Sequence, residues 1–182
     1  MKTKQILQSI LVLILITGLV EASTIGAVTP NNITISNNVV FELGILLSPS
    51  QNIGAAQVDI SYDPAVLRLE SVTIRNMFGA TAFSNNGTKS AGKVSGIYST
   101  ALSGGSTGTA GVLATVKFYT LKKGTTSVTL SNLKVVKPDY TTDVSTITNG
   151  LVVVQYPAWD INEDGVTDIT DLLIVASHYG EV

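Results

Sequence analysis

The chain has 182 residues, of which 45% are apolar and only 13% are charged, so it can form a hydrophobic core. Its formal net charge is −2, and no cluster of Lys or Arg provides the basic surface that nucleic acid binding requires. The absence of cysteine excludes disulfide bonds, a thiolate metal site and a catalytic thiol. The composition therefore favours a folded domain that does not bind nucleic acid.

The first 22 residues are predicted to be a signal peptide. Lys2 and Lys4 form a basic start, residues 6–16 are almost continuously aliphatic, and Val20 and Ala22 supply small side chains at the positions that signal peptidase recognises. An uncleaved membrane anchor is the alternative, although the apolar run is short for a membrane span. We therefore expect a secreted or cell-surface protein that has no membrane attachment after cleavage.

The mature chain is predicted to form short β-strands, because apolar and polar side chains alternate with a period of two. Strands are expected at residues 39–47, 55–62, 67–74, 93–101, 112–121, 127–136 and 151–155. Clusters of Asn, Gly, Ser and Pro, including residues 48–50, 85–87 and 123–124, are interpreted as turns. The pattern indicates an all-β fold, an antiparallel jelly-roll β-sandwich of about eight to nine strands that spans residues 23–155.

Four pieces of this region, in a fixed order, carry a family resemblance. They are residues 58–72, 111–118, 129–132 and 148–154, and in the first of them a strand ends in Tyr62, Asp63 and Pro64. Pro64 fixes its own φ and interrupts a strand ladder, while Asp63 can accept hydrogen bonds from backbone N–H groups of the turn. Together the pieces resemble the cohesin family, over roughly residues 36–155.

The resemblance implies a non-catalytic module that binds dockerin-bearing extracellular proteins through one sheet face. It places the partner-binding positions on the outward side of the strand before the turn, at Gln57, Asp59 and Ser61. The family pattern has Asn and Asp at the positions that align with Ala55 and Gln57, so we expect a specificity that differs from that of the best-known members. Considered singly, the same side chains are equally typical of a solvated sheet face.

The most specific motif follows a linker at residues 156–158, where residues 160–171 fit the spacing of a twelve-residue calcium loop. Gly165 occupies the sixth position, whose sharp turn favours a residue that tolerates positive φ. The expected ligands of a Ca²⁺ cofactor are Asp160, Asn162, Asp164, the carbonyl oxygen of Val166, Asp168 and Asp171. Residues 159–182 contain six acidic residues and no Lys or Arg, and such carboxylates repel one another until a cation neutralises them. A merely acidic, solvated tail is the alternative.

The segment at residues 159–182 resembles one repeat of a dockerin, because Asp171 closes the loop and an apolar helix is predicted from residue 172. Complete dockerins resemble a pair of such repeats. A single repeat could pack on the sandwich of its own chain, pair with another chain and so mediate self-association, or be the remnant of a truncated gene.

The sequence gives no support for catalysis. His178 is the only histidine, and no nucleophile or further metal ligand can be assigned to it. Asn32 and Asn86 begin N-glycosylation sequons, which arise often by chance in an Asn- and Thr-rich chain.

Two other functions are compatible with the sequence. A carbohydrate-binding β-sandwich would use exposed aromatic side chains, for which the candidates are Tyr98, Tyr119, Tyr140 and Trp159. A purely structural surface protein would need no binding face. A flat, polar face with an apolar centre favours protein recognition, whereas an aromatic groove favours sugar.

Overall fold

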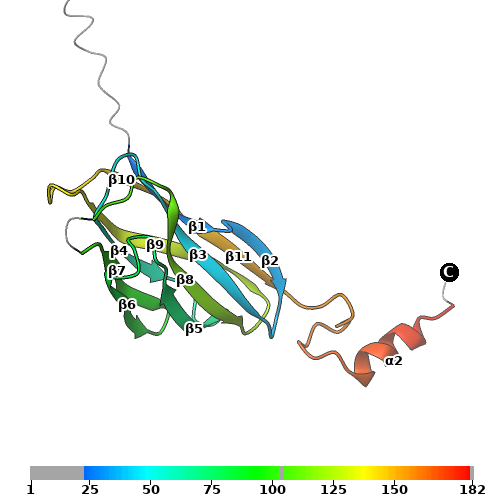
Figure 1. Cartoon of the computed structure of the whole chain (residues 1–182). Coiled ribbons are helices and arrows are strands. Elements are labelled where there is room, and N and C mark those ends of the chain that lie inside the picture. The colour runs from blue at the N-terminus through cyan, green and yellow to red at the C-terminus, as the bar shows by residue number, and fades with distance from the viewer. Residues whose placement is uncertain (1–22, 103–104, 181–182) are drawn as a thin grey trace, which may run out of the picture.

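The computed structural model describes residues 23–102 and 105–180, so the predicted signal peptide lies outside the described residues. Two β-sheets pack face to face (Figure 1). The first sheet contains, in spatial order, β10 (Ser145–Thr148), β1 (Thr24–Thr29), β3 (Val40–Ser48), β8 (Gly111–Thr120) and β5 (Leu67–Ile74). The second contains β2 (Asn32–Ser36), β11 (Gly150–Gln155), β9 (Gly124–Val136), β4 (Ala55–Ser61), β7 (Lys93–Thr100) and β6 (Phe83–Ser90).

The predicted all-β sandwich is confirmed, but the described residues form eleven strands rather than eight to nine. Three of the additional strands, β1, β2 and β10, lie in two stretches of chain, each of which changes from the first sheet to the second. Residues 24–36 form β1 and then β2, with Pro30 at the break, where the missing N–H cannot continue a ladder. Residues 145–155 form β10 and then β11, which run parallel to β1 and β2 respectively.

The turn predicted at residues 85–87 is wrong, because these residues lie within β6. The strand forms the edge of the second sheet, and its side chains are almost all exposed, so its polar composition resembles that of a loop. Gly87 has φ of +82° and faces inward, where an added Cβ would lie 2.7 Å from Val94 Cγ1. Glycine is thus required there by the backbone conformation and by the close approach of β7.

The hydrophobic core fills the space between the two sheets. Phe118 of β8 is fully buried at its centre, where its ring stacks on Phe41 at 5.8 Å and meets the edge of the Tyr62 ring at 5.0 Å. Leu43, Ile45, Val58 and Ile60 contribute alternate inward side chains from β3 and β4, as the period of two predicts.

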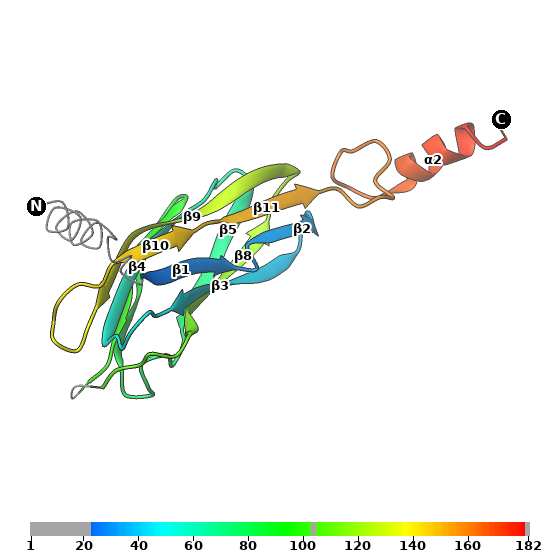
Figure 2. The same ribbon diagram turned by 90° about the horizontal axis from the view of Figure 1, so that it is seen from above.

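The chain after β11 leaves the sandwich and forms a loop followed by the helix α2 (Ile169–Ser177). In two views related by 90°, α2 points away from both sheets (Figures 1 and 2). Within the described part of the chain, no helix has the length and apolar character needed to cross a membrane.

Candidate partner-binding face and candidate calcium loop

The outer face of the second sheet is built from rows of side chains that lie opposite one another on neighbouring strands. In one row, Gln57 of β4 lies between Tyr98 of β7 and Lys134 of β9, and Tyr98 lies next to Asn85 of β6. The adjacent row along the strands contains Ala55, Thr100, Val136 and Phe83. These eight residues, with Ser61, are named the partner face.

A shallow hollow of about 190 Å³ lies on this face, between the side chains of Gln57, Tyr98 and Lys134. Beside it, Phe83 is 60% exposed, and its ring centroid lies 5.7 Å from that of Tyr98. The face therefore combines aromatic side chains on its β6 and β7 side with the polar Gln57 and the cationic Lys134 on β4 and β9. This combination is typical of a protein-binding surface.

Asp59 is placed differently from the other predicted partner-binding residues, because it is only 5% exposed. Register shifts interrupt the pairing of β4 with both of its neighbours at this point. The Asp59 carboxylate accepts hydrogen bonds from Gly96 N–H at 2.7 Å and from Asn132 Nδ2 at 2.8 Å, and Lys93 Nζ lies 3.7 Å away. Asp59 thus joins β4, β7 and β9, three of the four strands that carry the partner face.

Burial of Asp59 acts to raise the pKa of its carboxyl group, but the hydrogen bonds from Gly96 and Asn132 and the Lys93 ammonium outweigh it. The net effect is a pKa below the usual range for aspartate. Both hydrogen-bond donors have left-handed backbone conformations, with φ of +72° at Gly96 and +50° at Asn132. The carboxylate therefore stabilises backbone conformations that L-residues rarely adopt.

The other two predicted partner-binding residues are half-buried and face outward. Gln57 lies at the centre of the partner face, at the edge of the hollow. Ser61 lies at the far end of β4, opposite Lys93 of β7 and Thr129 of β9. Tyr98, Lys134 and Phe83 surround Gln57 but come from three other strands, so alternation along β4 alone could not identify them.

The four candidate aromatic residues do not form a single sugar-binding platform. Tyr98 belongs to the second sheet, whereas Tyr119 belongs to β8 of the first sheet, where Arg68 lies 4.5 Å from its ring centroid. Tyr140 lies in the connection after β9, and Trp159 lies beyond β11. The arrangement gives no support to the carbohydrate-binding alternative.

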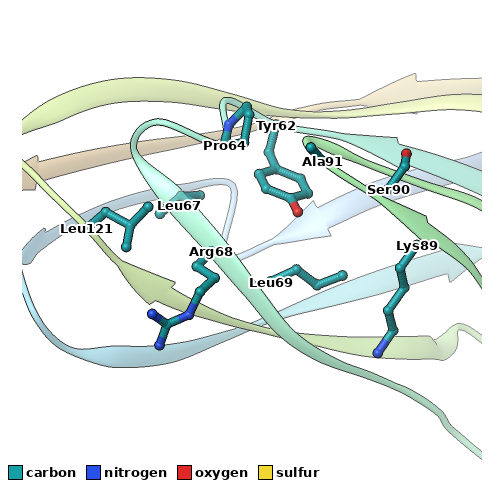
Figure 3. A pocket seen from close by; sticks show the side chains of 9 residues that line it. All are labelled: Tyr62, Pro64, Leu67, Arg68, Leu69, Lys89, Ser90, Ala91 and Leu121. Carbon is teal, nitrogen blue, oxygen red and sulfur yellow. The ribbon is translucent and has the colours of Figure 1, made fainter.

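A larger pocket of about 400 Å³ opens beside β5, near the connection between β6 and β7 (Figure 3). Its apolar lining includes Tyr62, Leu67 and Leu69, and Arg68 and Lys89 also line it. Arg68 Nε already pairs with Glu70 Oε1 at 2.8 Å. The pocket lies outside the partner face and contains no arrangement of nucleophile and base.

The predicted calcium loop adopts a tightly hydrogen-bonded turn. Gly165 has φ of +89°, and its N–H donates to Asp160 Oδ2 at 2.9 Å. Asn162 Oδ1 accepts from Asp164 N–H at 3.1 Å, and Asp164 Oδ1 accepts from Val166 N–H at 2.8 Å. The predicted ligands of the first half of the loop are therefore held by the backbone of the same turn.

The last two predicted acidic ligands cap α2. Asp168 is the N-cap residue, and its Oδ1 accepts from Thr170 N–H at 2.8 Å. Asp171 accepts from Asp168 N–H with one oxygen and from Ile161 and Asn162 N–H with the other. These backbone hydrogen bonds lower the pKa of Asp171, and the bond from the Asp168 N–H has the largest effect. Asp171 thus joins the beginning of the loop to its end.

The fit of this loop to a cation is partial. Asp160 is 4% exposed, and its Oδ1 is buried without a hydrogen-bond partner, which is the condition of an oxygen that binds a cation. All the predicted ligand atoms are oxygens, which Ca²⁺ prefers. However, no three His, Cys, Asp or Glu side chains converge as a metal site among the residues that the structure describes.

Contacts with the sandwich hold the loop in place. Asn37 Nδ2 donates to the Gly165 carbonyl oxygen at 3.2 Å, and Lys123 forms an ion pair with Glu163. The Lys123 ammonium also lies 5.7 Å from the centroid of the Tyr156 ring. The loop therefore packs on its own sandwich, which is one of the three arrangements left open by the sequence. The helix α2 does not share this packing.

The two packed sheets define the chain as a β-sandwich module. The cohesin domain model matches residues 25–154, and the chain belongs to this family. No curated protein matches the chain. The family match ends before the loop and α2, so the resemblance of residues 159–180 to a dockerin repeat stays a prediction.

Solved structures share the fold at low sequence identity. The cohesin CaCohA2 of Clostridium acetobutylicum is 20% identical, with a TM-score of 0.61 over 73% of this chain and 91% of that one. A non-cellulosomal cohesin of the archaeon Archaeoglobus fulgidus is 17% identical, with a TM-score of 0.61 over 74% and 92%. The sixth cohesin of Acetivibrio cellulolyticus scaffoldin B, solved in complex with a dockerin, is 19% identical, with a TM-score of 0.61 over 74% and 100%.

Proposed function

We propose that the chain is a secreted assembly module whose partner face binds the dockerin modules of other extracellular proteins. The observation that carries the proposal is the hollow beside Gln57, next to which the exposed Phe83 ring and Tyr98 provide apolar surface and Lys134 provides a cationic group. Cohesins of Acetivibrio cellulolyticus and Clostridium thermocellum, which share the fold, have been solved in complex with dockerins. The predicted signal peptide supports an extracellular location.

Binding of purified, immobilised protein to a panel of recombinant dockerins with paired calcium loops tests this proposal. We expect at least one dockerin to bind in the presence of Ca²⁺, and Gln57→Arg to weaken binding by about tenfold or more, since it places a bulky charge at the centre of the face. Glu42→Arg, on β3 of the other sheet, is the matched control and should bind normally. The proposal fails if no dockerin binds, or if Glu42→Arg has the same effect as Gln57→Arg.

We infer further that residues 160–171 bind Ca²⁺. Support comes from the buried, unpartnered Oδ1 of Asp160 and from the oxygen donors of Asn162 and Asp164 in the same turn. Val166 would contribute its carbonyl oxygen, and Asp168 and Asp171 would contribute carboxylate oxygens that also cap α2. An extracellular module of this kind is expected to have a dissociation constant of roughly 10⁻⁴ to 10⁻³ M.

Titration with Ca²⁺ or Tb³⁺ tests the metal site, because Trp159 lies next to Asp160 and can report binding by its fluorescence or by sensitised terbium luminescence. The wild-type chain should give a saturable signal, and Asp160→Asn should weaken the binding by about tenfold or more, since it removes a charged ligand. Asp139→Asn, which lies outside the loop, is the control. A wild-type chain that gives no saturable signal contradicts the inference.

A further inference from the structure

The helix α2 exposes apolar side chains on more than one side. Leu172 and Leu173 are each 60% exposed, and Ile169 and Val175 are exposed as well. Among its residues, Asp171 is the only buried one, and it faces the loop. A helix with so much apolar surface is normally covered by another protein surface.

The sandwich of the same chain does not provide that cover. Asn37 and Lys123 hold the loop at Gly165 and Glu163, on the end of the sandwich from which β11 emerges. From there α2 extends away from both sheets (Figures 1 and 2). The described part of the chain therefore offers no cover for α2, which makes a surface of another molecule the candidate.

The distribution of charge indicates which molecule this is. Residues 23–158 contain nine Lys or Arg and six Asp or Glu, whereas residues 159–182 contain six Asp or Glu and no Lys or Arg. Two copies of the acidic segment repel each other, but the acidic segment of one copy attracts the basic sandwich of another.

The partner face strengthens this attraction. Lys134 lies on the partner face, and Lys93 lies opposite Ser61, at the end of the face where β4 ends. Asp59, the acidic residue of β4, is buried and held by Gly96 and Asn132, so it adds little repulsion at the surface. Phe83 and Tyr98 provide apolar surface on the same face for the leucines of α2.

We propose that the C-terminal loop and α2 of one copy (residues 159–180) bind the partner face of a second copy. The proposal rests on the proposed function of that face and names this chain's own tail as one of its ligands. Leu172 and Leu173 pack against Phe83 and Tyr98, and the acidic loop lies near Lys93 and Lys134. Because tail and face are different surfaces, the contact is head-to-tail, and repeated contacts of this kind extend into open chains or larger rings.

Two complementary variants test the proposal by sedimentation velocity. The face variant carries Gln57→Arg and Lys134→Glu, and the tail variant carries Leu172→Gln and Leu173→Gln, which keep the helical propensity of α2. Wild-type protein should form species larger than dimers as its concentration rises, and salt should weaken them. Each variant alone should be monomeric, with an association constant reduced by about tenfold or more. Their equimolar mixture should form a 1:1 dimer, because one member contributes an intact tail and the other an intact face.

Lys89→Glu provides the matched control, since it reverses a charge at the pocket beside β5 instead of on the partner face. It should self-associate like the wild type. The proposal is overturned if Lys89→Glu abolishes association while the face variant preserves it, because the tail then binds the pocket. It is also overturned if the face variant alone still self-associates, which would indicate tail-to-tail pairing, or if the wild type stays monomeric. Thermal unfolding verifies that each variant is folded.

The tail variant separates this proposal from the proposed function. Its face is intact, so it should still bind a dockerin of the panel. If it does so while the wild type stays monomeric, self-recognition is refuted and dockerin binding stands. If it binds none, and the wild type binds none, the proposed function itself has failed.

Discussion

The side-chain amide of Asn37 donates a hydrogen bond to the carbonyl oxygen of Gly165, at 3.2 Å, across 128 positions of sequence. Asn37 is buried in the turn between β2 and β3, and its own N–H donates to the Gln155 carbonyl oxygen at 2.9 Å. One residue therefore holds both the end of β11 and the turn of the predicted calcium loop. The position of the loop depends on the sandwich, which the loop's own sequence does not reveal.

Asn37→Ala should release the loop from the sandwich while leaving the sandwich folded. The loss of this partly buried hydrogen bond should lower the free energy of unfolding by about 0.5–1.5 kcal/mol. Hydrogen exchange should become faster in residues 160–166, and the affinity for Ca²⁺ should fall. Asn31→Ala, an exposed residue before β2, is the control. Unchanged exchange in residues 160–166 would show that Asn37 does not restrain the loop.

Gly165→Ala should damage the loop more than the same change at Gly180. Both glycines have φ near +90°, so alanine at either position costs about 1 kcal/mol in backbone strain. At Gly165 the new Cβ would also lie 3.3 Å from Tyr156 Cε1, whereas at Gly180 no atom lies within 4 Å. Calcium titration of the two variants should therefore show weaker binding only for Gly165→Ala. Equal affinities would contradict the proposed role of this turn.

Asp59→Asn should destabilise the sandwich in a pH-dependent way. Because folding lowers the pKa of Asp59, the ionised carboxylate stabilises the fold fully above its unfolded-state pKa of about 3.9. That contribution is lost as the pH falls through the lower, folded-state pKa. We expect a deficit of about 1–3 kcal/mol at pH 7, because hydrogen bonds to a charged group are lost.

Denaturant unfolding of both proteins at several pH values measures this effect. The difference between the wild type and Asp59→Asn should shrink below about pH 4, where the carboxyl of the unfolded chain takes up a proton, and it should disappear as the pH falls through the lower, folded-state pKa. Asp63→Asn, which removes a charge from the exposed turn after β4, is the control for net charge. A deficit of the same size at pH 7 and pH 3 would refute the role assigned to the carboxylate.

Phe118→Ala and Phe83→Ala should separate stability from binding. Phe118 is fully buried between Phe41 and Tyr62, so its truncation should cost about 3–5 kcal/mol of unfolding free energy. Phe83 is exposed on the edge strand β6, so its truncation should change stability by only about 0.5 kcal/mol. It should nevertheless weaken dockerin binding, measured on the same panel. A strongly destabilised Phe83→Ala variant would mean that this ring supports the fold instead of the face.

The strands with clear apolar alternation could be predicted from the sequence, and β5 at Leu67–Ile74 has the predicted bounds. Among the strands that were missed, β1 lacks this signal for a physical reason. In β1, the inward positions include Thr24 and Gly26, and Thr24 is buried because its hydroxyl donates to Asp143 at 2.5 Å. Its partner lies 119 positions away, so only the folded chain reveals why a polar residue faces the core.

The candidate sites were predictable to different degrees. The spacing of acidic residues in the loop is local, so residues 160–171 were recognisable as a unit. The orientation of Gln57 and Ser61 follows from alternation along one strand. The burial of Asp59 does not, because it depends on irregularities in β7 and β9 that bring Gly96 and Asn132 to its carboxylate. The neighbours of Gln57 across the sheet likewise come from pairing between distant segments.

The parallel pairing of β1 with β10 and of β2 with β11 has a mechanical consequence. The folded chain begins at β1 near one end of the sandwich and leaves β11 near the other (Figure 2). A tensile force applied between these points slides each parallel pair along its length, so the hydrogen bonds of a ladder bear the load together instead of breaking one at a time. A module built in this way should resist stretching between the start of β1 and the end of β11.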